Sequence, residues 1–294
     1  MALSKIEAAK LGNDLLLRGV IETIVKESSV LSYLPFMQVT GTAVTYNRES
    51  TMPEAAFYDP GDTWTEATPT FSQHTAQLAI LGGDADVDNF LQATYADAND
   101  IEAEVIANRA KAVAHAFSDS FFNGNIATNA KSFDGLHRLI PAGQTVSAGA
   151  NGAALTLGML DELVDRVRPG RADLLLMSKR TRRKLKDLRR SSGYVLETGM
   201  NQFGQQVEVY DGIPVVVDDF IKDDQAVGTG TGLSTIYAIK FGQGTGVMGL
   251  EHGGIAVERV GELETKDATR TRIKWYCGLG LFNEFGAAKL EGIA

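Results

Sequence analysis

The stretch at 39–75 most limits what this chain can fold into. It is rich in Thr, Pro and acidic residues, and its apolar alternation is confined to the region of Val44 and Tyr46. Turn signals stand at 52–53 (Met-Pro) and at 59–62 (Asp-Pro-Gly-Asp). An insertion of this length without a core of its own is uncommon in a compact domain and often serves contact with another chain. The sequence therefore predicts a long, hairpin-like excursion.

The clearest single element runs over 99–122. Asn99 can cap its start, Glu102 stands where a capping-box acid would, and Asn123-Gly124 can end it in a left-handed turn. At 1.5 Å per residue, this pattern predicts a rod of roughly 36 Å. The apolar residues that recur along one stripe of this helix are Ile101, Val105, Ile106, Ala110, Val113, Phe117 and Phe121.

The middle third alternates helices with short strands. Thr156 is placed to cap one helix, which the Arg-Pro-Gly at 168–170 ends, and Ser178 is placed to cap a second helix that runs to about Arg190. The run Leu174–Met177 is entirely apolar and predicts a buried strand. Further strands are expected at 207–210, 213–217 and 235–241.

The last part predicts two long antiparallel strands, at 255–264 and 270–282, rich in β-branched and aromatic residues. Such a pair cannot close a core alone. The helix at 99–122 and the strand-like run at 77–90 are its natural partners. The middle unit would then be inserted between two halves of one elongated domain, which makes the fold class α+β.

Composition excludes several function classes. With 28 Lys and Arg against 37 Asp and Glu, the formal charge is −9, which argues against a generally basic nucleic-acid binder. Cys277 is the only cysteine, so the chain can form neither an internal disulfide nor a zinc site with two thiolates. The apolar runs are too short for a membrane span and the first ten residues lack a signal-peptide pattern, so we expect no membrane association.

One dense basic run, 179–190, carries eight positive charges against Asp187. It could contact nucleic-acid phosphates. It could equally be a surface helix anchored by Leu185 and Leu188, with its basic end favoured by the helix dipole. The lack of interleaved aromatic residues favours the surface helix.

Residues that could carry catalysis are sparse. Asp84, Asp86 and Asp88 have the spacing of a calcium loop, but Asn89 stands in place of the required Gly and Tyr95 in place of the bidentate Glu. The four histidines have no metal-binding spacing, and no nucleophile motif is present. We expect no enzyme, no metal and no cofactor. The simpler interpretation of the three aspartates is the solvated face of a strand whose other face is Leu81, Ala85 and Val87.

The order of these parts, together with several short phrases, is more informative. The phrases are LPF at 34–36, TYNRE at 45–49, LGGDADVDNF at 81–90, SFDGL at 132–136 and YDGIPVVVDD at 210–219. Over essentially the whole chain, this series resembles the major capsid proteins of tailed bacteriophages, which have the Hong Kong 97-type shell fold.

The resemblance implies a division into five segments. These are an N-terminal arm at 1–38, whose first 27 residues have helical spacing, an extended E-loop at 39–75, a peripheral domain with a long spine helix at 76–150, an inserted α/β axial domain at 151–250, and returning peripheral strands at 251–294. The candidate interface residues are Arg48, Glu49, Glu54, Phe57, Tyr58, Trp64 and Glu66.

The resemblance also implies a function. Chains of this family assemble as hexamers and pentamers into an icosahedral shell around double-stranded DNA. The inner face of the shell contacts the packaged DNA without sequence specificity. We expect synthesis in the host cytoplasm, a location in the virion capsid, a portal, and a separate scaffolding protein because the arm starts at Met1. Since no Lys occurs between Lys26 and Lys111, we expect no isopeptide bond from the E-loop.

Two alternatives remain open. The first is an encapsulin-like compartment with the same fold, which would enclose a cargo enzyme. The second is a metal-dependent hydrolase that uses Asp84, Asp86 and Asp88.

Overall fold

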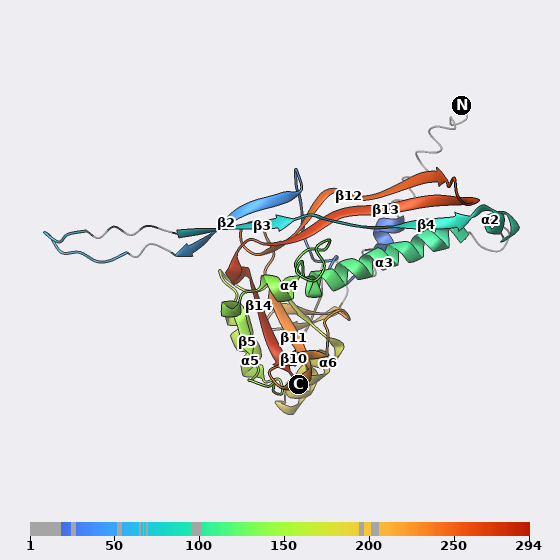
Figure 1. Cartoon of the computed structure of the whole chain (residues 1–294). Helices are drawn as coiled ribbons and strands as arrows, with labels where there is room; N and C mark the ends of the chain where they lie inside the picture. The colour runs from blue at the N-terminus through green and yellow to red at the C-terminus, as the bar shows by residue number, and fades with distance from the viewer. Residues whose placement is uncertain are drawn as a thin grey trace.

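The computed structural model describes residues 19–24, 28–51, 55–64, 66, 68, 70–95, 101–193, 197–200 and 206–294. A four-stranded sheet forms the long upper body in Figure 1. Its strands β12 (Val247–Glu262) and β13 (Ala268–Leu281) are antiparallel, β4 (Ala79–Asp88) pairs antiparallel with β13, and β1 (Phe36–Gln38) pairs parallel with β12. In spatial order they are β1, β12, β13 and β4.

A second, eight-stranded sheet forms the lower body. Helices α5 (Leu157–Asp165) and α6 (Lys179–Ser191) pack on one of its faces, where Leu160, Leu163 and Leu185 are fully buried. The strands follow the order β5 (Thr145–Ser147), β14 (Ala287–Ile293), β11 (Gly230–Ile239), β6 (Leu174–Met177), β9 (Ile213–Val217), β8 (Gln206–Tyr210) and β7 (Glu197–Met200), and β10 (Gln225–Val227) also pairs with β11.

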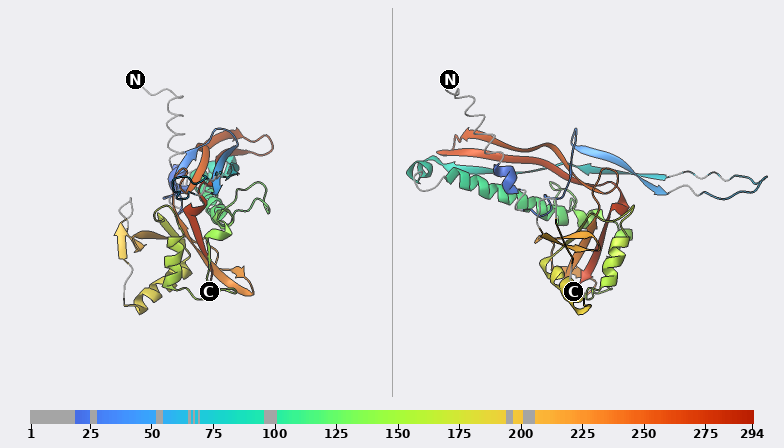
Figure 2. Two further views of the ribbon diagram at one scale, coloured as in Figure 1. Left: turned by 90° about the vertical axis from the view of Figure 1, so that its left-hand side faces the viewer. Right: turned by 180° about the vertical axis from the view of Figure 1, so that it is seen from behind.

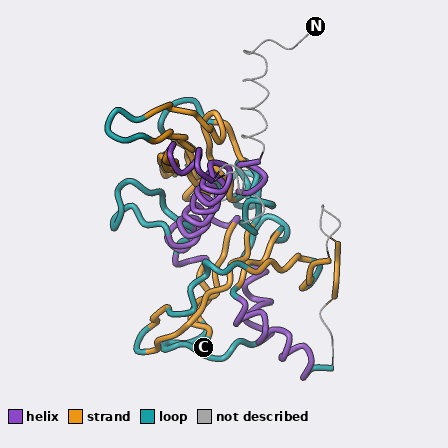
Figure 3. The backbone as a smooth tube through the Cα atoms, turned by 90° about the vertical axis from the view of Figure 1, so that its right-hand side faces the viewer, coloured by secondary structure: helices purple, strands orange, loops and turns teal. Residues whose placement is uncertain are grey.

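The long helix α3 (Ile101–Asn123) joins the two bodies through one hydrophobic core. Phe117 is fully buried, and its ring lies 4.8 Å from that of Trp275 in the four-stranded sheet. Phe122 is also fully buried, and its ring lies 5.7 Å from that of Tyr237 in the eight-stranded sheet. Figures 1 and 3 show α3 between the two groups of strands. The bodies are therefore parts of one packed unit.

Shorter elements complete the described fold. Residues 19–24 are helical and lie beside α3, as the rear view in Figure 2 shows. Val20 and Ile24 of this segment are buried in the shared core. The other short elements are α2 (Asn89–Tyr95), α4 (Leu136–Leu139), η1 (Ala142–Gln144) and η2 (Glu284–Gly286).

Several local predictions are confirmed. Thr156 caps α5, with its hydroxyl accepting a hydrogen bond from the Met159 amide at 3.3 Å. Ser178 caps α6, accepting from the Thr181 amide at 3.3 Å. All four residues of β6 are buried, as the apolar run predicted. The cap predicted at Asn99 lies outside the described residues, as does most of the predicted helix in the first 27.

The predicted left-handed end of α3 is wrong. Gly124 does not adopt a positive φ. Its amide donates to the Ser120 carbonyl at 2.9 Å, and its own carbonyl accepts from the Gly135 amide at 2.9 Å. A Cβ at this position would lie only 2.3 Å from the Phe133 carbonyl oxygen. Glycine is needed here because two backbone segments approach closely, which the sequence pattern of a helix end does not reveal.

The last strand departs from the expected order of segments. β14 falls within the predicted returning segment at 251–294, whereas in the structure it pairs with β11 and β5 of the eight-stranded sheet. The sequence analysis did not predict β14 as a strand of the eight-stranded sheet. The predicted strands at 255–264 and 270–282 correspond to β12 and β13.

The crowding at Gly124 gives a test of this core junction. Gly124→Ala should lower the free energy of unfolding by about 1 to 3 kcal/mol, because the added methyl group meets backbone that cannot move aside cheaply. Gly143→Ala is the matched control, since a Cβ there has nothing within 4 Å. Urea unfolding of both variants measures the difference, and equal stabilities would contradict the crowded geometry.

Candidate assembly surface

A two-stranded antiparallel hairpin projects beyond the body. It consists of β2 (Ala43–Thr51) and β3 (Thr70–Gln77), which pair only with each other among the described strands. Figure 1 shows it extending away from the four-stranded sheet. Its root rests on a small cluster in which Val39, Ala76 and Leu250 are buried, so the body supports only one end of the hairpin.

Arg48 bonds the hairpin to the body of its own subunit. Its Nε donates to the Leu281 carbonyl at 3.1 Å, and its Nη2 donates to the same oxygen. The guanidinium lies 5.6 Å from the centre of the Tyr46 ring, which in turn packs 4.7 Å from Phe282. Burial and then the Arg48 charge lower the pKa of His74, whose ring stacks on Tyr46. The structure thus gives Arg48 a supporting contact at the root.

The distal loop is ordered by local contacts but leaves aromatic surface uncovered. The Asp59 amide donates to an Asp62 carboxylate oxygen at 2.8 Å, which confirms the predicted turn. Tyr58 and Trp64 stack with ring centroids 4.4 Å apart. Phe57 is fully exposed and Trp64 is 78% exposed. The distal loop thus leaves two large apolar side chains in contact with solvent.

The remaining interface candidates are placed less fully. Glu66 is exposed, near the distal loop. Glu54 and the side chain of Glu49 lie outside the described residues. Phe71 on β3, which the sequence analysis did not select, is 63% exposed. The uncovered aromatic side chains of the hairpin are thus Phe57, Trp64 and Phe71, and we call them the hairpin aromatics.

The aspartates proposed for a metal-dependent hydrolase are used otherwise, so that alternative is wrong at these residues. Asp84 accepts two hydrogen bonds from Arg272, at 2.7 and 3.0 Å, and Asp86 accepts two from Arg270, at 2.6 and 2.7 Å. These arginine hydrogen bonds hold the pKa of both carboxyls below the usual range. Asp88 caps α2 instead, accepting from the amides at 90 and 91. A cation would have to displace two bidentate arginines.

The simpler interpretation of these aspartates is confirmed. Ala85 and Val87 are buried on the opposite face of β4, and Leu81 packs against the shared core. Asp84 and Asp86 face solvent and lie directly opposite Arg272 and Arg270 in the register of β4 and β13. Within the described residues, no group of three or more metal-ligating side chains comes together.

The charge of the basic helix α6 is partly compensated, because four of its eight cations form ion pairs with acids on neighbouring elements or on α6 itself. Lys179 pairs with Asp219 at 2.6 Å, and Arg180 lies 3.5 Å from Asp223. Lys186 forms an ion pair with Glu208. Arg189 stacks on the Tyr210 ring at 4.7 Å, and Leu185 is fully buried beneath the helix. The arrangement is that of the anchored surface helix that the sequence favoured.

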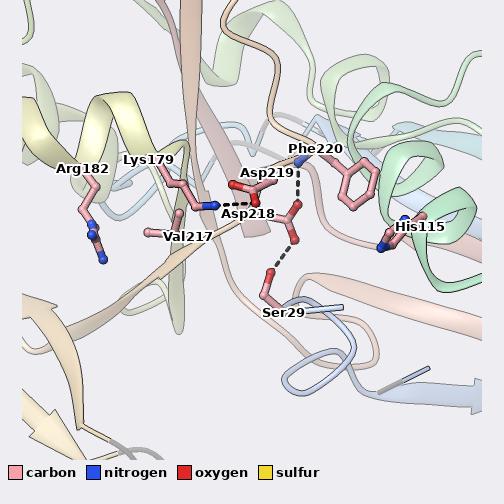
Figure 4. A pocket seen from close by; sticks show the side chains of 8 residues that line it. All are labelled: Ser29, His115, Lys179, Arg182, Val217, Asp218, Asp219 and Phe220. Carbon is pink, nitrogen blue, oxygen red and sulfur yellow. Dashed lines mark hydrogen bonds and ion pairs between the residues drawn. The ribbon is translucent and has the colours of Figure 1, made fainter. Parts of the chain in front are cut away.

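A polar pocket lies where α6, α3 and the N-terminal segment meet (Figure 4). It has a volume of about 450 Å³. At its centre Asp218, only 4% exposed, accepts hydrogen bonds from the Ser29 hydroxyl at 2.5 Å and from the Phe220 amide at 2.9 Å. Burial raises the pKa of Asp218. The pocket is lined by Ser29, His115, Lys179, Arg182, Val217, Asp218, Asp219 and Phe220.

Sequence reasoning missed this pocket because its parts come from four distant places in the chain. Ser29 and Asp218 are 189 residues apart. The only local signal was the pair of adjacent acids at the end of a predicted buried strand, Asp218 and Asp219.

Solved structures share this fold. The encapsulin SrpI of Synechococcus elongatus PCC 7942, in its holo complex, matches with a TM-score of 0.73 and 18% identity, over 100% of this chain and 96% of its own. The capsid of an empty GTA particle matches with a TM-score of 0.67 and 17% identity, over 91% of this chain and 90% of its own. A structure from Mycobacterium phage Bobi matches with a TM-score of 0.63 and 13% identity, over 90% and 89%. At these identities the likeness shows the fold alone.

An elongated sheet backed by one long helix, a second sheet on the same core and a projecting hairpin make up the fold that this chain shares with the SrpI encapsulin and the GTA capsid. Residues 13–292 match the model of the Phage capsid family, and the chain belongs to that family. It is a structural capsid protein of the bacteriophage type, and membership implies a place in the virion capsid. The resemblance seen in the sequence is confirmed.

No curated protein sequence matches the chain. Among the helices of the described residues, none is both long and apolar enough to cross a membrane.

The root of the hairpin gives a second test. Arg48→Ala should lower the local opening free energy of β2 and β3 by roughly 1 kcal/mol, because the Leu281 carbonyl loses its donor. Hydrogen exchange of residues 43–51 and 70–77 measures this change, and the unfolding midpoint of the whole chain should stay nearly constant. Arg183→Ala, which removes an exposed arginine from α6, is the control. Unchanged exchange in the hairpin would show that Arg48 does not support it.

Proposed function

We propose that the chain is the major capsid subunit of a tailed bacteriophage, which assembles as hexamers and pentamers into an icosahedral shell around double-stranded DNA. The observation that carries this proposal is the hairpin, whose aromatics the subunit's own body leaves uncovered. Family membership and the shell structures with the same fold support it.

The hairpin provides an interface of the kind that such a shell needs. A surface at the projecting end of one subunit meets a different surface on the next, so the contact is head-to-tail and can close into rings. Burial of Phe57 and Trp64 on a neighbour would stabilise the folded hairpin only in the assembly. Tyr58 holds Trp64 by stacking and so presets the shape of this contact.

The proposed packing of DNA rests on charge. The chain carries a net charge of −9, and four of the eight cations in its densest basic run, at 179–190, pair with acids on α6 and on the neighbouring strands and turns. Sequence-independent grip on DNA requires clustered, uncompensated Lys and Arg. We infer an inner face that tolerates packed DNA without sequence-specific contact. A separate scaffolding protein and a portal belong to the same proposal.

The division into an N-terminal arm at 1–38, an E-loop at 39–75, a peripheral domain at 76–150 and 251–294, and an axial domain at 151–250 is part of this proposal, with β5 and β14 as exceptions because they pair in the eight-stranded sheet. β2 and β3 lie within the proposed E-loop, except for the last residues of β3. α3 corresponds to the proposed spine helix, and α5 and α6 lie in the proposed axial domain.

An encapsulin-like compartment is the second candidate. It is favoured by the likeness to the SrpI encapsulin, which spans 100% of this chain. The contents of the purified particles discriminate between the two functions. Packaged double-stranded DNA supports the viral proposal, whereas a co-purifying cargo enzyme supports the compartment.

Removal of the distal aromatic side chains tests the proposed interface. The double variant Phe57→Ala/Trp64→Ala should leave the subunit folded but raise the concentration needed for assembly. Loss of a buried aromatic anchor costs about 2 kcal/mol or more per contact, which corresponds to roughly a thirtyfold change in the equilibrium constant. Light scattering and negative-stain electron microscopy across a concentration series measure the onset of assembly.

Phe285→Ala is the matched control, since Phe285 is an exposed aromatic residue outside the hairpin, at 40% exposure. It should assemble like the unmodified chain. Normal assembly of the double variant would remove Phe57 and Trp64 from the proposed interface.

A further inference from the structure

Two consecutive serines bind the N-terminal segment to different parts of the molecule. The Ser28 hydroxyl hydrogen-bonds the Ser118 hydroxyl of α3 at 2.8 Å, and both side chains are almost completely buried. The Ser29 hydroxyl donates to Asp218 Oδ2 at 2.5 Å, in the turn that follows β9 of the eight-stranded sheet. Ser28 is therefore bonded to α3, and its neighbour Ser29 to a turn of the eight-stranded sheet.

The turn at 218–220 is itself bound on both sides. The Asp218 amide donates to the carbonyl of Met177, the last residue of β6, at 3.2 Å. The Asn123 side-chain amide, at the end of α3, donates to the Phe220 carbonyl at 3.0 Å. The Phe220 ring lies 5.4 Å from the ring of His115. Figure 4 shows both side chains at the pocket. The turn thus follows the position of α3 as well as that of the sheet.

Apolar burial continues from the same segment. Val30 is fully buried and Leu34 is 5% exposed, both in the core that α3 shares with the two sheets. The chain then enters β1, which pairs with β12. A shift of α3 relative to the eight-stranded sheet would strain this set of bonds, because Ser28 is bonded to α3 and Ser29 to a turn that is held by both parts.

We propose that Ser28 and Ser29, with Ser118 and Asp218, form a pH-sensitive clasp through which docking of the N-terminal segment and the position of α3 against the eight-stranded sheet change together. This device goes beyond the capsid function proposed above and does not depend on what the shell contains. When α3 moves relative to the eight-stranded sheet, the bonds of Ser28 and Ser29 transmit that movement to the N-terminal segment.

Asp218 supplies the response to pH. Four other titratable or charged side chains line the pocket around Asp218. They are Asp219 in the same turn, His115 on α3, and Lys179 and Arg182 on α6. Lys179 is paired with Asp219 at 2.6 Å. Burial is the largest effect on Asp218 and raises its pKa, while the hydrogen bonds from Ser29 and Phe220 oppose that rise.

The sign of the response follows from that direction. A carboxyl whose pKa is raised in the closed state stabilises that state below the ordinary pKa of Asp. This contribution is lost as the pH rises through the raised pKa of the closed clasp. We expect the clasp to hold most firmly in acid and to loosen as Asp218 ionises, with the polar pocket beside it admitting water.

Hydrogen exchange of the full-length chain over a pH series, corrected for the intrinsic exchange rate, tests the clasp. Protection of residues 28–34 and 218–221 should fall together as the pH rises. In Ser29→Ala both segments should exchange about tenfold faster or more, which corresponds to about 1.4 kcal/mol. In Asp218→Asn the pH dependence of both segments should disappear.

Asp219→Asn is the matched control, because it removes the neighbouring exposed carboxylate and its ion pair with Lys179 but leaves Asp218 in place. It should keep the pH dependence. Ser29→Thr retains the hydroxyl and should keep the coupling, which separates the hydrogen bond from a general defect in folding. The proposal is overturned if Ser29→Ala loosens 28–34 without affecting 218–221, or if Asp218→Asn responds to pH like the unmodified chain.

Discussion

The structure depends on the burial of aromatic side chains from α3 in one core that two sheets share. Phe117 contacts Trp275 of the four-stranded sheet and Phe122 contacts Tyr237 of the eight-stranded sheet. Since Phe/Trp→Ala changes in such cores cost about 3 to 5 kcal/mol each, separation of the sheets would be very unfavourable. The buried Val30 ties the N-terminal segment to the same core. Most of the chain is thereby held as a single packed unit.

The hairpin is the exception, because it projects beyond this packed unit. Only its root is held, by a small apolar cluster and by the bonds of Arg48 to Leu281. Its distal aromatics meet water in the isolated subunit. On the function proposed above, another copy would cover these aromatic side chains, and the folded hairpin would then be fully stabilised only in the assembly. The ion pairs that join β4 to β13 keep the adjoining sheet face polar.

Prediction from the sequence succeeded where the signal was local. The stripe of apolar residues located α3, Thr156 and Ser178 marked the starts of α5 and α6, and the lack of core residues located the hairpin. It failed where partners are distant in the chain. The pair Asp84–Arg272 spans 188 residues, so the sequence favoured the solvated face of a strand over a metal site but gave no sign of the arginine partners. The place of β14 and the Ser29 contact had no local signal either.

A cryo-electron microscopy reconstruction of particles assembled from this chain is the most direct test of the account. It should show residues 55–64 lying on an adjacent subunit, with Phe57 and Trp64 buried against it and the body unchanged around α3. A reconstruction in which the hairpin folds back onto its own body, or points into solvent without a neighbour, would contradict the account.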